Sequence, residues 1–129
     1  MVSAWECFHS AILELVRSTP LKQRLVCAFR RHLSLLREDQ LPSEVREAFG
    51  QIIRAMSGVP PLRGEDAVAS SVRKMSILEA EECAAQLVEI FGIMSKIQVA
   101  AMRHHPIVQL HSIERRSEEF EKPAFIASV

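Results

Sequence analysis

The chain has 129 residues, of which 48% are hydrophobic and 25% are charged, and its sixteen basic residues balance sixteen acidic ones. This size and composition suit one folded domain and exclude a collagen-like or disordered chain. A net charge of zero gives no overall attraction to nucleic acid or to an anionic membrane, so such binding would need a local patch.

Apolar residues at helical spacing predict three helices in the first half of the chain. The first opens at the capping-box sequence of residues 3–6. Pro20 ends this helix and also suits the first position of a second helix, which is predicted to reach about Arg37. Ser43 is the expected N-cap of a third helix, and Gly58 is its expected left-handed stop.

Two further helices follow a loop. The prolines and glycines of residues 58–64 predict this loop. A short fourth helix follows the acidic residues 65–66, whose charges suit the positive end of a helix. A second capping box, residues 76–79, opens the longest helix, which is predicted to run to about Arg103 and to end before Pro106.

These elements predict an all-α, up-and-down helical bundle of four principal helices with a short fifth helix. We expect residues 1–129 to form a single domain. An extended C-terminal tail over residues 114–129 is expected to lie free or to dock on a partner.

The long helix carries the most informative pattern. One row of apolar residues alternates spacings of three and four, as in helices that pack lengthwise: Ala80, Cys83, Leu87, Ile90, Met94, Ile97 and Ala101. A second row, broken by Ser95 and Gln98, lies beside it: Ala84, Val88, Phe91 and Met102. Two rows need two neighbours. Either the same chain supplies both, or one row meets a second copy or another protein.

We therefore predict a small non-catalytic interaction or regulatory protein that acts through helix faces and self-associates. The candidate contact residues are Leu87 and Met94 in the long helix and Phe125 and Ile126 in the tail. The expected partner is a second copy of the chain or another protein, and not a membrane.

The second helix suggests an alternative function. It carries five basic residues before any acidic one: Lys22, Arg24, Arg30, Arg31 and Arg37. A nucleic-acid-binding protein would place such a helix against phosphates. The zero net charge and the lack of a helix-turn-helix spacing favour a solvated basic face instead. Its expected counterpart is acidic residues of the long helix: Glu79, Glu81, Glu82 and Glu89.

The histidines predict neither a metal site nor a catalytic base. His104, His105 and His111 are close in sequence, but a proline separates the first two from the third and no zinc-site spacing is present. His32 falls in the apolar stripe of the second helix. We expect a hydrogen-bonded core histidine there and not a catalytic base, because no serine, cysteine or carboxylate is identifiable as its partner in catalysis. We find no nucleotide-binding or hydrolase motif, so we predict no cofactor and no enzyme activity.

The cellular location is also an expectation from the sequence. The N-terminal segment has no basic region, and acidic residues interrupt its apolar positions, so we expect no secretory signal. No eighteen apolar residues run together, from which we expect no membrane span. Three widely spaced cysteines without a C-x-x-C pair are typical of reduced thiols. Together these features predict a cytoplasmic protein.

Overall fold

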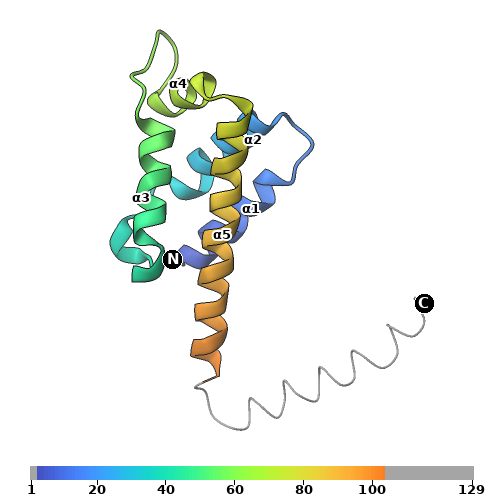
Figure 1. Ribbon diagram of the computed structural model, residues 1–129, viewed down its shortest axis with the longest axis vertical. Helices are drawn as coiled ribbons and strands as arrows, with labels where there is room; N and C mark the ends of the chain where they lie inside the picture. Colours follow the sequence, from blue (N-terminus) through green and yellow to red (C-terminus); the bar gives the residue numbers. More distant parts are fainter. Residues whose placement is uncertain (1–2, 104–129) are drawn as a thin grey trace, which may run out of the picture. The chain divides into compact units, whose positions relative to one another are not determined.

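The computed structural model describes residues 3–103, and these residues form helices and no strand (Figure 1). The five α-helices are α1 (Ala4–Leu15), α2 (Leu21–Ala28), α3 (Ser43–Ser57), α4 (Ala67–Lys74) and α5 (Ile77–Met102). A π-helix, η1 (Phe29–Leu33), continues α2, and a 3-10 helix, η2 (Glu38–Gln40), precedes α3. The predicted all-α bundle is confirmed. The tail and the histidine group at 104–111 lie outside the described residues.

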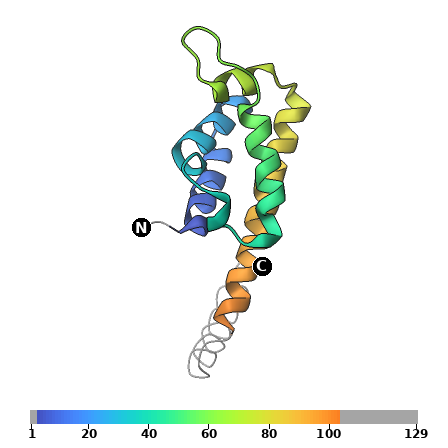
Figure 2. The same cartoon turned by 90° about the vertical axis from the view of Figure 1, so that its left-hand side faces the viewer.

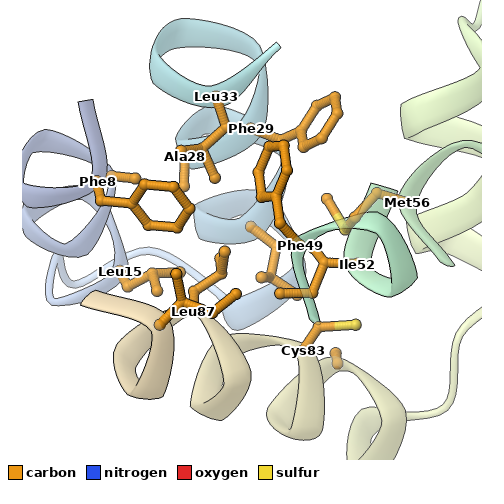
Figure 3. Close-up of a cluster of buried hydrophobic side chains, with 14 of the residues drawn as sticks. Phe8, Leu15, Ala28, Phe29, Leu33, Phe49, Ile52, Met56, Cys83 and Leu87 are labelled. Carbon is orange, nitrogen blue, oxygen red and sulfur yellow. The ribbon is translucent and has the colours of Figure 1, made fainter. Parts of the chain in front are cut away.

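The chain divides into two compact units, one up to Ser95 and one from Lys96 onward. The core of the first unit takes side chains from all five helices. Within this unit α3 and the first part of α5 run antiparallel and side by side (Figures 1 and 2). Phe8 of α1 meets Phe49 of α3 edge to face, with ring centroids 5.6 Å apart (Figure 3). Such an aromatic pair adds about 1 kcal/mol to the free energy gained by burial.

Side-chain caps start three of the helices where the sequence predicted. The hydroxyl of Ser3 accepts the backbone N–H of Glu6 at 3.1 Å and opens α1. The Asp66 carboxylate accepts the N–H of Ala69 at the start of α4. At the start of α5, residues 76 and 79 exchange both bonds of a capping box, each at 3.0 Å. These three starts are confirmed.

The second helix ends earlier than predicted, at Leu33 rather than Arg37. Its last turn is a π-helix, in which the N–H of Ser34 donates to the carbonyl of Phe29 at 2.8 Å. The hydroxyl of Ser34 also donates to the carbonyl of Arg30 at 3.0 Å. A serine that bonds the preceding turn competes with continued helix, and by Arg37 the backbone is extended.

The third helix begins one residue earlier than predicted. Pro42 takes the N-cap position, and the hydroxyl of Ser43 donates to the Glu44 carboxylate at 3.1 Å instead of capping the helix. The predicted left-handed stop at Gly58 is also wrong, because Gly58 has φ of −77°. The left-handed residue is Gly64, with φ of +76°, in the predicted loop.

Candidate functional site

The first apolar row of α5 is covered by the chain's own helices. Leu87 and Met94 are 1% and 4% exposed, and the row is buried from Ala80 onward as far as Met94. Figure 3 shows Leu87 facing side chains of α1 and α3. These two predicted contact residues are therefore core residues of the first unit and present no surface to a partner. The other two predicted contact residues, in the tail, lie outside the described part of the chain.

Helix α1 covers part of the second row. The indole N–H of Trp5 donates to the hydroxyl of Ser95 at 2.9 Å. The Trp5 ring also lies on His9 and Phe91, with centroids 5.2 Å and 5.4 Å away. Phe91 and Ser95 are half-buried as a result. Val88 of the same row stays 50% exposed.

A third row of positions on α5 is largely exposed. Of the ten exposed large hydrophobic side chains among the described residues, six lie on α5, and three of these six belong to this row: Val88, Val99 and Met102. We define the outer row as the positions, spaced alternately three and four apart, that include these three: Ala85, Val88, Gly92, Ser95, Val99 and Met102. Four of these six residues have exposed side chains: Ala85, Val88, Val99 and Met102. At Gly92 there is open space where a Cβ would lie. Only Ser95 is partly covered, by Trp5.

The outer row is hard to recognise from the sequence because three of its six members are small: Ala85, Gly92 and Ser95. Alanine and glycine at positions 85 and 92 do not stand out as apolar anchors, although the alternating spacing is present in the sequence. A heptad count started at Ala85 would have found it.

By length and composition alone, α5 is also able to cross a membrane. The core helix of a water-soluble protein can meet the same criteria, but such a helix is mostly buried. In α5 only 22% of the most apolar stretch is buried. That stretch includes the charged residues Glu89 and Lys96. The absence of a membrane partner therefore stays a prediction.

A buried carboxylate on α1 provides the partner for His32 that the sequence did not reveal. The Glu14 side chain is 8% exposed, and its Oε1 lies 3.6 Å from His32 Nε2 and 3.4 Å from Arg31 Nη1. Its Oε2 lies 3.2 Å from Arg17 Nε. A buried carboxylate needs such partners to offset the loss of hydration. His32 itself is only half-buried, and 3.6 Å is longer than a hydrogen bond, so His32 lies beside a charged group at the edge of the core and is not the hydrogen-bonded core histidine that was expected.

A cavity of about 400 Å³ opens beside His32, with Cys7 and Ser10 in its wall. The hydrogen bonds found among residues 3–103 include none that joins His32 to either of these two side chains. The same residues contain no group of three or more His, Cys, Asp or Glu side chains that could hold a metal ion.

Cys83, a second thiol, faces a hollow of about 440 Å³ beside α3. Burial raises the pKa of the Cys83 thiol, and the charges of Glu79 and Glu82 raise it further. A raised pKa keeps the thiol protonated, which is the opposite of what a reactive cysteine requires.

Arginines of the basic group pair with carboxylates other than those predicted. Arg30 forms two hydrogen bonds with Asp66, at 2.6 Å and 3.0 Å. The Arg30 guanidinium holds the pKa of Asp66 below its ordinary value, and the pair raises the pKa of Arg30. Arg31 pairs with Glu14, and Arg37 with Asp39 at 3.3 Å. The counterparts of these arginines are thus on α1, at the start of α4 and in η2, and not on α5.

The two remaining basic residues bind backbone carbonyls near helix ends. Arg24 donates to the carbonyl of Leu15, the last residue of α1, at 2.6 Å. Lys22 donates to the carbonyls of Arg73 and Met75 at the end of α4. Unpaired carbonyls at the end of a helix attract such cations. All five basic residues therefore have partners within the chain, although the Arg30, Arg31 and Arg37 side chains stay exposed.

No family model matches this chain, and no curated protein or solved structure matches it either.

Proposed function

We propose that this is a non-catalytic helical interaction protein that binds a second copy of itself through the outer row of α5. The observation that carries the proposal is that apolar residues lie around most of α5, whereas its fully buried residues all belong to the row that includes Leu87. An exposed apolar row on such a helix normally meets a partner. The chain's own helices cover the side that includes Leu87, and a second copy would cover the side that includes Val88.

The distribution of polar groups supports a role without catalysis. His32 is engaged by Glu14, and the thiol of Cys83 is kept protonated by burial.

Burial of apolar area between two helices gives roughly 25 cal/mol for each Å² removed from water. Val88, Val99 and Met102, each about half exposed, provide such area on the outer row.

Light scattering coupled to size-exclusion chromatography tests the proposal. At micromolar concentration we expect twice the chain mass of 14.6 kDa. The Val88→Lys substitution should shift the protein to a monomer, because a lysine would place its charge in the apolar contact. Leu62→Lys is the matched control, since Leu62 is also exposed but lies in the loop before α4.

A monomer for the unsubstituted chain would overturn the proposal. A monomer that floats with phospholipid vesicles would overturn it as well and would point to a membrane as the partner of α5. If Leu62→Lys abolishes the dimer while Val88→Lys keeps it, the contact is not on α5.

A further inference from the structure

We infer that the two copies pair their α5 helices antiparallel, with the crossing near Gly92. This inference rests on the proposed self-association and adds its geometry. It depends on the charges beside the outer row and on the sizes of the side chains within that row.

Four charged residues follow one edge of the outer row at intervals of seven: Glu82, Glu89, Lys96 and Arg103. Positions seven apart on one helix share a face, and all four side chains are exposed. The first two are acidic and the last two basic. The edge is therefore negative towards the start of α5 and positive towards its end.

This order of charges favours antiparallel pairing. In a parallel pair the charged edge of each copy would face the opposite edge of the second copy, where Ala84, Phe91 and Gln98 provide no opposite charge. In an antiparallel pair Glu89 lies opposite Lys96 of the second copy, and Glu82 lies opposite Arg103 of the second copy. Charged residues that flank an apolar seam select orientation in this way.

The sizes of the outer-row residues fit the same arrangement. Antiparallel pairing sets Gly92 against Ser95 of the second copy at the centre, Val88 against Val99, and Ala85 against Met102. Small residues meet at the crossing, where backbones come closest, and a large residue meets a small one at each end. No atom of the chain lies within 4 Å of the place where a Cβ would stand at Gly92, so the backbone of a second helix has room to come close there.

Charge reversal tests the pairing. Glu89→Lys alone and Lys96→Glu alone should each raise the dimer Kd by about tenfold, because each variant creates two like-charge contacts in the symmetric pair. The double variant Glu89→Lys with Lys96→Glu should return the Kd to within about threefold of the unsubstituted value, since the opposite charges meet again. Glu47→Lys on α3 makes the same charge change on an exposed residue elsewhere and should leave the Kd unaltered.

Disulfide trapping tests orientation directly, in a chain with Cys7→Ser and Cys27→Ser so that only the buried Cys83 remains. A mixture of Val88→Cys and Val99→Cys chains should cross-link, and Val88→Cys alone should not. In the antiparallel pair the two Val88 positions are eleven residues apart along the helix, about 16 Å, whereas a disulfide needs Cα atoms within about 7 Å.

The outcomes separate the two proposals. Cross-linking of Val88→Cys with itself would overturn the antiparallel arrangement while leaving self-association intact. A double charge variant that stays as weak as the single variants would overturn the charge pairing. A chain that is monomeric by light scattering would instead contradict the proposed function itself.

Discussion

Glu14 is the residue whose position the sequence concealed most completely. From the sequence it only interrupts the apolar residues of the first helix, because two of its three partners, Arg31 and His32, come from a different helix. In the folded chain it is buried and connects α1 to η1 through Arg31 and His32. No local spacing encodes this contact, so only the tertiary structure reveals it.

We expect Glu14→Ala to lower the free energy of unfolding by about 1–3 kcal/mol, because it leaves polar partners without their acceptor. The cost stays below that of breaking a fully buried ion pair, since the Arg31 side chain is 63% exposed and keeps its hydration. Urea denaturation measures the change. Arg17→Ala, which removes one exposed partner, should cost less than about 0.5 kcal/mol. Equal losses in the two variants would contradict the buried role of Glu14.

Asp66 makes stability depend on pH in the acid range. Hydrogen bonds from Arg30, and then from the backbone of Ala69, hold the pKa of Asp66 below its ordinary value of 3.8. Because the folded-state pKa is the lower one, the stabilisation is present above 3.8 and is lost as pH falls through the folded-state pKa. Asp66→Asn keeps a capping side chain but removes the titration. Its urea midpoint should fall less steeply than that of the unsubstituted chain between about pH 4 and pH 2.

Arg30→Gln provides the second arm of this experiment, because it removes the main cause of the lowered pKa of Asp66 while keeping the carboxyl group. It should flatten the same part of the pH profile. A slope as steep as that of the unsubstituted chain in both variants would show that other carboxyls control acid unfolding.

At the scale of elements, helix starts were more predictable than helix ends. The caps at residues 3, 66 and 76 act over three residues, so the sequence contains the whole interaction. The π-turn after Ala28 was not predicted, since neither glycine nor proline marks the end of that helix. Ser34 provides the only local reason for it, and serine occurs in many positions where a helix continues.

Two of the serines predicted as caps, Ser76 and Ser43, allow a direct comparison. We expect Ser76→Ala to cost about 1 kcal/mol of unfolding free energy, because the Ser76 hydroxyl satisfies the N–H of Glu79 at the start of α5. Ser43→Ala should change the unfolding free energy by less than about 0.5 kcal/mol, because the Ser43 hydroxyl caps no backbone group. Thermal or urea unfolding of both variants measures the difference, and a larger loss for Ser43→Ala would contradict the assigned start of α3.

For the whole molecule, the sequence predicted that α5 needs more than one neighbour but not which side each neighbour covers. Apolar residues lie around most of the helix, so periodicity alone gives several acceptable faces. Packing against α1 and α3 decides the question for the row containing Leu87. The aromatic contact of Trp5 then covers Phe91, and the outer row is what remains.

Lysine substitutions on two sides of α5 separate folding from association. Met94 is 4% exposed in the core, so Met94→Lys would bury an unpaired charge and should cost at least about 3 kcal/mol of unfolding free energy. Val88 is half exposed, so Val88→Lys should leave helicity nearly unchanged while lowering the mass seen by light scattering, and its urea midpoint should fall only by the stability that association supplied. If Met94→Lys instead gave a folded monomer, the row assigned to the core would be an interface. Circular dichroism and light scattering on the same samples distinguish these cases, because only loss of the fold lowers helicity and only loss of the contact lowers mass at constant helicity.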